Sequence, residues 1–356
     1  MQERVFNFNP GPSTLPLEVL QQAQSELLNY KGTGMSILEI SHRAPEFEEI
    51  VTQTEALFKE LAGVGDDYRV LFFQGGASQQ FALIPLNFLG TNKSADYVIT
   101  GSFGEKAYKE AKKIGKVNVV ATTAAVGHKR IPEQAELKLT KDAAYVHITT
   151  NNTIYGTQWH YIPETNGVPL VADMSSDILS RPLDYSKFDL IYAGAQKNLG
   201  PSGVVLVMVH KKMLERVNPD LPTIFSYETF AKNNSLYNTP PTFGIYMLKL
   251  VLEWIKKFGG LTAVAEHNQA KAALLYDVID EDDFYHGHAE APSRSYMNVT
   301  FRLANAELEK TFLQEAEAQG IYGIKGHRSV GGIRASIYNA MSLAGCEKLA
   351  TFMRDF

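Results

Sequence analysis

The chain has 356 residues, 45% hydrophobic and 21% charged, an ordinary balance for a globular protein with a large core. Its 34 Lys and Arg against 39 Asp and Glu give a formal net charge of −5, which argues against general nucleic-acid binding. The single cysteine, Cys346, excludes an intrachain disulfide and an all-cysteine metal site, and we expect no metal.

Residues 1–12 lack the apolar stretch of a signal peptide. The longest strongly apolar run, 204–209, is far too short to span a membrane. A single cysteine also fits a reducing compartment. We therefore expect a cytoplasmic protein without membrane contact.

The predicted elements begin with an extended N-terminal segment, 1–14, expected to pack with a small C-terminal domain. Apolar residues then recur at helical spacing over 20–30. A second helix opens at Pro45, where the missing N–H of proline costs little, and ends near Gly63.

From residue 70, short apolar runs alternate with helical stretches. The runs are 70–73, 97–100, 117–121, 144–148, 170–172, 190–193 and 204–209, and helices are predicted up to 89 and over 105–114. Unbroken apolar runs of this length are typical of strands buried on both faces. The alternation predicts an α/β fold with a mostly parallel sheet between helix layers.

The pattern changes after a long amphipathic helix at 243–258, in which Trp254 is predicted to be core. That helix ends at Gly259 and Gly260. The following elements are a helix at 262–278, a strand at 297–303, a helix at 306–318, a strand at 332–338 and a helix at 343–352. We therefore expect a large domain over 15–260 and a small α+β domain over 261–356.

Lys197 comes just after the predicted strand 190–193, between small residues and a Gly-Pro-Ser-Gly turn. Lysine forms Schiff bases when its surroundings lower its pKa, and small neighbours leave room for a bulky ring. Ligands bind at the carboxyl ends of strands in α/β sheets. A lone lysine would otherwise be a solvated loop residue.

Asp173 ends the predicted strand 170–172. A carboxylate leaving a buried strand needs a partner, and a protonated pyridine nitrogen is one suitable partner. Taken alone, Asp173 would be a helix cap or half of a salt bridge. Its separation from Lys197 leaves room for one crossover, so the pair is more informative than either residue.

Gly75 and Gly76 follow another predicted strand and open a helix. The N–H groups and the dipole at such a helix start favour a phosphate, although a tight structural turn would have the same sequence. Two His-Arg pairs, His42 with Arg43 and His327 with Arg328, together with Arg334, suggest that one end of the pocket binds anions.

These motifs resemble the class V aminotransferases, enzymes of the pyridoxal-phosphate (PLP) fold type I, and among them the phosphoserine aminotransferases. The resemblance covers nearly the whole chain. It is carried by Phe-Asn-Phe-Asn-Pro-Gly-Pro at 6–12, Glu-Ile-Ser-His-Arg at 39–43, Gly-Gly at 75–76, Ala-Asp-Met-Ser-Ser at 172–176, Ala-Gly-Ala-Gln-Lys-Asn at 193–198, Tyr-Asn-Thr-Pro-Pro-Thr at 237–242 and the stretch 326–339.

The resemblance implies a role for each candidate residue. Lys197 is implied to hold PLP as a Schiff base and Asp173 to pair with its ring nitrogen. Binding of the cofactor phosphate is implied for Ala77 and Ser78, with Gln196 close by as a further cofactor-binding residue. Ring stacking is implied for Phe103, a hydrogen bond to the ring hydroxyl for Thr153, and phosphate contacts from a partner subunit for Asn238 and Thr239. Phe103 stands where the family commonly has Trp, and Ser78 where some members have Arg.

The resemblance also implies a homodimer that takes small-molecule substrates. L-glutamate donates an amino group to 3-phosphohydroxypyruvate, giving O-phospho-L-serine and 2-oxoglutarate, and 4-phosphohydroxy-L-threonine is a possible second substrate. Arg334 is implied to bind the substrate α-carboxylate. The pairs His42–Arg43 and His327–Arg328 are implied to bind the side-chain anion.

Two other classes of protein share these features. A cysteine desulfurase on the same fold needs a cysteine nucleophile, and Cys346, which we expect to pack in a C-terminal helix, is the only candidate. A non-catalytic cofactor- or phosphate-binding protein would have no need to keep both Asp173 and Lys197.

Overall fold

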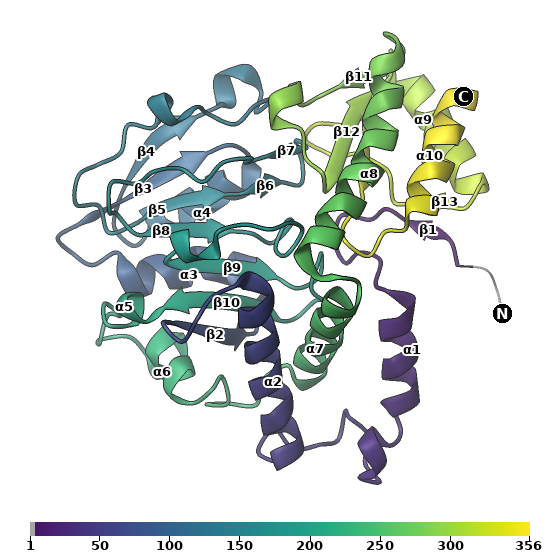
Figure 1. Cartoon of the computed structure of the whole chain (residues 1–356). Helices are drawn as coiled ribbons and strands as arrows, with labels where there is room; N and C mark the ends of the chain where they lie inside the picture. Colours follow the sequence, from purple (N-terminus) through teal and green to yellow (C-terminus); the bar gives the residue numbers. More distant parts are fainter. Residues whose placement is uncertain (1–3) are drawn as a thin grey trace.

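The structure, a computed structural model, describes residues 4–356, so the first three residues of the predicted segment 1–14 lie outside it. Its centre is a seven-stranded sheet with the strand order β2-β10-β9-β8-β5-β3-β4 (Figure 1). The strands are β2 (Tyr68–Phe73), β3 (Ser94–Ile99), β4 (Lys116–Thr122), β5 (Val146–Thr149), β8 (Leu170–Asp173), β9 (Leu190–Gly194) and β10 (Val205–His210). Strand β10 alone runs opposite to the other six strands of this sheet, which confirms the mostly parallel sheet.

Helices cover both faces of the central sheet. One face packs against α1 (Leu17–Glu26), α2 (Pro45–Ala62) and α7 (Thr242–Lys257), and the other against α3 (Gly76–Phe88), α4 (Ser102–Lys112), α5 (Lys211–Leu214) and α6 (Tyr227–Lys232). Neighbouring strand residues enter opposite cores: Leu206 belongs to the first and Val205 to the second. Burial on both faces explains why these strands read as unbroken apolar runs.

A third core lies in the C-terminal part of the chain. There the antiparallel strands β11 (His286–Gly287), β12 (Asn298–Arg302) and β14 (Ile333–Ser336) pack with α8 (Gly260–Glu281), α9 (Ala306–Ala318) and α10 (Leu343–Asp355). Helix α8 contributes Val264 to the first core of the large sheet and Ala272 to this one. The division of the chain at residue 260 therefore stays a prediction.

The N-terminal strand β1 (Phe6–Asn7) runs parallel to β13 (Ile321–Tyr322) in the C-terminal part. A short hairpin of β6 (Asn151–Asn152) and β7 (Thr157–Gln158) follows β5 and was not predicted. The remaining elements are short 3-10 helices, η1 (Tyr30–Gly32), η2 (Ala124–Val126), η3 (Gln134–Glu136), η4 (Tyr185–Lys187), η5 (Thr223–Phe225) and η6 (Ala291–Ser293).

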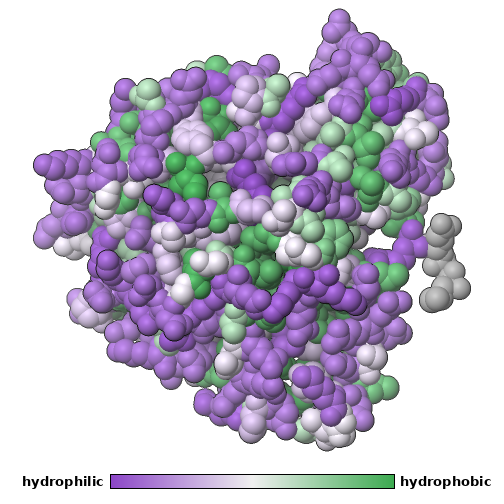
Figure 2. Space-filling view, in the orientation of Figure 1, coloured by the Kyte–Doolittle hydropathy of each residue, from purple (hydrophilic) through white to green (hydrophobic). Residues whose placement is uncertain are grey.

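The predicted helix over 20–30 ends early, because α1 stops at Glu26 and Lys31 has a positive φ of 47° inside η1. The prediction that Trp254 is core is wrong: its side chain is only partly buried and borders a cavity. Across residues 4–356, none of the helices combines the length and the apolarity that crossing a membrane requires. The face seen in Figure 2 is mostly hydrophilic, with hydrophobic side chains gathered near its centre.

Candidate active site

A cavity of about 280 Å³ lies where the parallel strands of the central sheet end. The segments that follow β2, β3, β5, β8 and β9 all reach it. Nine of the predicted site residues line it: Ala77, Ser78, Phe103, Thr153, Asp173, Gln196, Lys197, His327 and Arg334. Carboxyl ends of parallel strands meet at one edge of a sheet, which is why residues far apart in sequence converge there.

Lys197 is the amine of this cavity. Its Nζ donates a hydrogen bond to Oγ1 of Thr153 at 2.7 Å and lies 5.3 Å from the ring centroid of Phe103. Burial lowers the pKa of Lys197 to about 8, against the opposing charge of Asp173, while the charge of Arg334 lowers it further. A substantial neutral fraction near neutral pH makes the amine a nucleophile.

Asp173, at the end of β8, is 5% exposed. Burial raises the pKa of its carboxyl group; hydrogen bonds from Ser175, the charge of Lys197 and a hydrogen bond with Tyr192 act in the opposite direction. The backbone N–H of Ser175 donates to Oδ1 at 2.9 Å. Burial outweighs these contacts, so the ionised carboxylate would gain from a further cationic partner in the cavity.

Helix α3 points its N-terminus into the same cavity. Gly75 and Gly76 have φ values of 88° and 70°, a left-handed backbone that favours glycine. No side chain caps this helix start, so its first N–H groups, around Ala77 and Ser78, are available to an anion. A Cβ on Gly75 would lie 1.6 Å from Oε1 of Gln79, the end of a flexible side chain that can move, so the backbone conformation is what favours glycine here.

The opposite wall carries the cations. Arg334, on β14, is 6% exposed; burial lowers its pKa, and its Nε has no hydrogen-bond partner among residues 4–356. Burial and the charges of Arg334 and Arg328 lower the pKa of His327, whose Nδ1 lies 2.7 Å from Oγ of Ser329. A buried guanidinium with an unused donor is suited to a carboxylate ligand.

Five predicted site residues do not line this cavity within one chain: His42, Arg43, Asn238, Thr239 and Arg328. Arg328 is exposed and follows His327, which does line the cavity. Nε2 of His42 and Oδ1 of Asn238 are buried without a hydrogen-bond partner in the described part of the chain. The assignment of these five residues to the site therefore stays a prediction.

Other residues of the site carried no role in the sequence analysis. Thr149, Asn151 and Ser175 line the cavity, and so do Pro10 and Gly11 from the N-terminal segment. The motifs at 6–12 and 172–176 contain three of them and were the available signal. Cys346 is different: it is fully buried in α10, and burial raises the pKa of its thiol to about 12, which does not suit a nucleophile.

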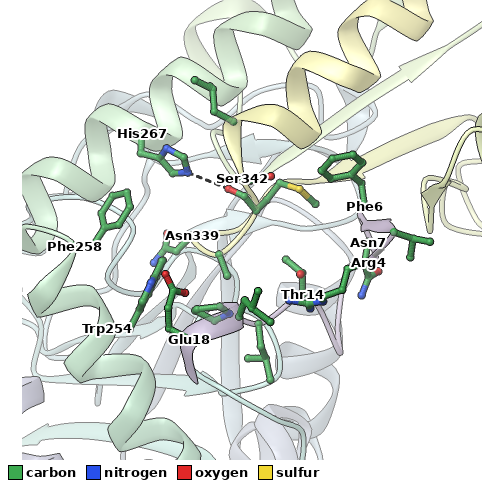
Figure 3. Close-up of a pocket in the computed structure, with 17 residues that line it drawn as sticks. Arg4, Phe6, Asn7, Thr14, Glu18, Trp254, Phe258, His267, Asn339 and Ser342 are labelled. Atoms are coloured by element: carbon green, nitrogen blue, oxygen red, sulfur yellow. Dashed lines mark hydrogen bonds between the residues drawn. The ribbon is translucent and has the colours of Figure 1, made fainter. Parts of the chain in front are cut away.

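A larger cavity, of about 430 Å³, contains none of these residues. It lies beside the N-terminal segment and is bordered by Trp254 of α7, Phe258 just after α7, His267 of α8 and Ser342 just before α10 (Figure 3). The His267 ring nitrogen Nε2 donates to the carbonyl oxygen of Met341 at 3.0 Å. Size alone therefore does not locate the chemistry of this protein.

The comparisons with known proteins agree with this geometry. The family described as aminotransferase class-V matches residues 5–349. A phosphoserine aminotransferase of Herpetosiphon aurantiacus is 62% identical over 99% of this chain and 98% of its own length, and one of Bacillus subtilis is 55% identical over 99% and 98%.

Two solved structures are similar over almost the full length. Phosphoserine aminotransferase from Bacillus circulans subsp. alkalophilus has a TM-score of 0.98 at 53% identity and covers 99% of this chain and 98% of that chain. PLP-bound phosphoserine aminotransferase from Trichomonas vaginalis has a TM-score of 0.94 at 36% identity and covers 99% of this chain and 100% of that chain. The chain therefore belongs to the class V aminotransferases, which have the PLP-dependent fold type I, and within them to the phosphoserine aminotransferase family.

Proposed function

We propose that this protein is a PLP-dependent aminotransferase that moves the amino group of L-glutamate to 3-phosphohydroxypyruvate, giving 2-oxoglutarate and O-phospho-L-serine in serine biosynthesis. The observation that carries the proposal is the meeting of Lys197, Asp173 and the uncapped start of α3 in one cavity. Membership of the phosphoserine aminotransferase family supports the choice of substrates.

The donor set of the cavity fits PLP. A buried carboxylate, an amine with a pKa of about 8, the face of a phenyl ring and unused helix N–H groups match the ring nitrogen, aldehyde, ring and phosphate of that cofactor. When bound, PLP supplies an electron sink for the charge left on the substrate Cα after a proton is removed.

The roles of the protein residues follow from their positions. Nζ of Lys197 holds the cofactor and carries the proton to and from the substrate Cα, because it is the amine of the cavity. Asp173 holds a proton on the ring nitrogen. The cofactor is oriented by Ala77, Ser78, Phe103, Thr153 and Gln196.

The substrate anions belong at the cationic wall. Arg334, buried with an unused donor, binds the α-carboxylate shared by both substrates. The pairs His42–Arg43 and His327–Arg328 bind the γ-carboxylate of glutamate and the phosphate of the keto acid in turn. A guanidinium donates in a planar fork that suits both anions, so one site serves both halves of the reaction.

The protein acts as a homodimer in this proposal, in which Asn238, Thr239 and Arg43 of one copy reach the site of the other; the support is that none of the three lines the cavity of its own chain. The segment that leads to His42 exposes Leu28 by 84% and Leu38 by 57%, an apolar surface suited to a second copy of this chain. We also propose a cytoplasmic location and the use of 4-phosphohydroxy-L-threonine as a second substrate.

The test is absorption spectroscopy on protein reconstituted with PLP. The band of the bound cofactor should shift when L-glutamate is added and return when 3-phosphohydroxypyruvate follows, with O-phosphoserine and 2-oxoglutarate found by mass spectrometry. If neither substrate changes the absorption band of the bound cofactor, the result would instead support a non-catalytic cofactor-binding protein. Sulfide release from L-cysteine would support a desulfurase.

A further inference from the structure

A chain of buried polar side chains crosses from the large sheet to the C-terminal part of the molecule beside the candidate active site. Asn151 of the β6–β7 hairpin lines the cavity, and Nδ2 of Asn151 donates to Oδ1 of Asn298, in β12, at 2.8 Å. The two residues are 2% and 0% exposed. In Figure 1 the hairpin and β12 lie next to each other, in agreement with this hydrogen bond. Asn298 itself does not line the cavity.

The amide group of Asn298 also reaches β14 and the N-terminal segment. Its Nδ2 donates to Oγ of Ser336, in β14, at 2.9 Å and to the hydroxyl of Tyr338, just after β14, at 3.3 Å. The hydroxyl of Tyr338 donates in turn to the carbonyl oxygen of Pro10, which lines the cavity, at 2.7 Å. An asparagine amide has two N–H donors and one acceptor oxygen, and Asn298 uses all of them.

The amide group of Asn151 is satisfied in the same way. Its Nδ2 also donates to Oγ of Ser176, another lining residue, at 2.8 Å, and its Oδ1 accepts from Oγ of Ser295 at 2.5 Å. Because every donor and acceptor of the two amides has a partner, rotating either amide would break several hydrogen bonds of buried groups at once. The network therefore holds one arrangement of the hairpin, β12 and β14.

Arg334 depends on this arrangement. Ser336 is paired in register with Asn298, and Arg334 with Thr300. Residues two apart on a strand point to the same face, so Ser336 and Arg334 share a face of β14. The Nε of Arg334 has no hydrogen-bond partner among residues 4–356, so the backbone of β14 sets the position of the guanidinium. The contact from Asn298 to Ser336 fixes this face of β14 relative to the hairpin.

We propose that Asn298 is a positioning residue for the reaction: by joining β14 to the β6–β7 hairpin, it sets the place of Arg334 relative to the cofactor-binding wall. The proposal rests on the proposed function, in which Arg334 binds the α-carboxylate of both substrates. Misplacing a binding group by about 1 Å can lower a rate about 10²-fold, even when the altered residue lies far from the chemistry. Asn298 therefore affects substrate binding without touching the substrate.

The first test measures anion binding in Asn298→Ala, which removes all three hydrogen bonds of the side chain. The probe is glutarate, which has both carboxylates of glutamate but no amino group, so its Kd reports anion binding without turnover. Asn298→Ala should raise the Kd of glutarate for the PLP-loaded protein, and lower kcat/KM for L-glutamate, at least about tenfold. The affinity of the apoprotein for PLP should stay within about threefold of wild type, because the residues assigned to PLP are unchanged.

A milder variant keeps the proposal testable if Asn298→Ala does not fold. Tyr338→Phe deletes one hydroxyl, and the Kd of glutarate and kcat/KM should change about threefold to tenfold, the effect of one buried hydrogen bond. Tyr285→Phe is a matched control, because Tyr285 is buried in the C-terminal core and its hydroxyl donates to the carbonyl oxygen of Met353 at 2.7 Å, away from the cavity. Tyr285→Phe should leave both quantities at their wild-type values.

A double-mutant cycle with Arg334→Gln separates positioning from a general loss of structure. If Asn298 acts through Arg334, Asn298→Ala should raise the Kd of glutarate by less than about twofold in a protein that already carries Arg334→Gln. If the two losses multiply, Asn298 acts independently of Arg334 and the proposal is refuted. A loss of PLP affinity as large as the loss of glutarate affinity would also refute it, because the network would then serve the cofactor wall. The same cycle applies to Tyr338→Phe.

The single variant Arg334→Gln distinguishes this proposal from the proposed function. If Arg334→Gln binds glutarate and uses L-glutamate as the wild type does, the assignment of Arg334 to the α-carboxylate fails whatever Asn298 does. If Arg334→Gln loses both while Asn298→Ala and Tyr338→Phe keep them, the assignment of Arg334 stands and the positioning role of Asn298 alone is wrong.

Discussion

Lys197 donates a hydrogen bond from its amine to the hydroxyl of Thr153, 44 residues earlier in the chain, at 2.7 Å. Thr153 lies in the turn between β6 and β7, so the hairpin fixes where the amine points. The bond holds Nζ over the ring of Phe103, 5.3 Å from its centroid. The amine thus faces the space in which a planar cofactor would stack.

Replacing Lys197 with Ala should abolish turnover, because the amine that holds the cofactor and moves the Cα proton is lost. Loss of proton transfer alone costs on the order of 10²–10⁴ in rate. Lys106→Ala is the control, since Nζ of Lys106 lies over the same ring at 5.0 Å. Steady-state assays should find near wild-type rates for Lys106→Ala, and a comparable rate in Lys197→Ala would mean that another group is the reacting amine.

The lowered pKa of Lys197 predicts the pH dependence of cofactor capture by the apoprotein. Burial holds this pKa at about 8, so the neutral amine grows about tenfold per pH unit below that value and levels off above it. Stopped-flow absorbance with PLP should follow the same curve. A rate that keeps rising toward the ordinary lysine pKa of about 10.4 would contradict the lowered value.

Lys271 should make the folded protein more stable at high pH. Its amine is fully buried and donates to the carbonyl oxygens of Ile337 at 2.9 Å and Tyr338 at 2.7 Å, and burial lowers its pKa to about 7. Between this value and the unfolded value of about 10.4, the unfolded chain binds more protons, so the free energy of unfolding rises with pH.

Urea titrations of wild type and Lys271→Met at two pH values measure this effect. From about pH 7.5 to about pH 9.5, the wild type should gain about 2 kcal/mol relative to the variant, with other titrating groups cancelling in the difference. In Lys257→Met, at an exposed lysine of α7, the free energy of unfolding should change with pH as it does in the wild type. If the free energy of unfolding of Lys271→Met also changed with pH as it does in the wild type, Lys271 would be charged in the folded state up to high pH.

Substitutions of Arg328 and of Arg334 should affect the two half-reactions differently. Arg328→Gln should lower kcat/KM for the phosphorylated substrate by at least roughly thirtyfold and for glutamate by less, because phosphate offers more charge and more acceptors. Arg334→Gln should lower both about equally, since both substrates carry an α-carboxylate. Stopped-flow traces of each half-reaction measure this, with exposed Lys325→Gln as the control in the same loop. Unchanged phosphoserine kinetics in Arg328→Gln would remove Arg328 from the site.

Subunit complementation decides whether Arg43 serves the partner's site. Arg43→Gln and Lys197→Ala should each be poorly active alone. When the two proteins are unfolded together and refolded, about half of the dimers are mixed, and each mixed dimer has one intact site if Arg43 acts across the interface. Activity should then reach about a quarter of wild type. No recovery in verified mixed dimers would place Arg43 in the site of its own chain.

The central sheet was predictable because its strands are buried on both faces and are therefore apolar throughout. The predicted run 204–209, for example, is offset by one residue from β10, which spans Val205–His210. The β6–β7 hairpin was not predictable, because it is held by buried polar contacts with distant residues. Asn152 donates to Thr100 and to Thr157, and Asn151 to Ser176 and Asn298. Such partners leave no periodic pattern in the sequence.

The candidate site shows the same division. Lys197 and Asp173 were predictable because each follows a buried strand whose end faces the ligand edge of the sheet. Thr149 and Asn151, which also line the cavity, were not, because a buried polar residue in or after an apolar strand has no assigned role until its neighbours across the sheet are known. Trp254 falls on the apolar stripe of α7, yet the cavity beside it leaves its side chain partly exposed.

The N-terminal segment joins the two parts of the molecule at the reacting amine. Phe6 is paired with Ile321 beside the small sheet, and Ser13 donates from its hydroxyl to the carbonyl oxygen of Lys197 at 2.7 Å. A Cβ on Gly11 would lie 3.2 Å from Cγ of Lys197, so the chain is drawn close over the lysine stem.

The segment therefore connects the β1–β13 pair to the backbone of Lys197 through a few residues, beside the cavity of about 430 Å³ (Figure 3). Changes at Gly11 or Ser13 should alter the position of the Lys197 amine, although both residues lie more than 180 positions away in the sequence.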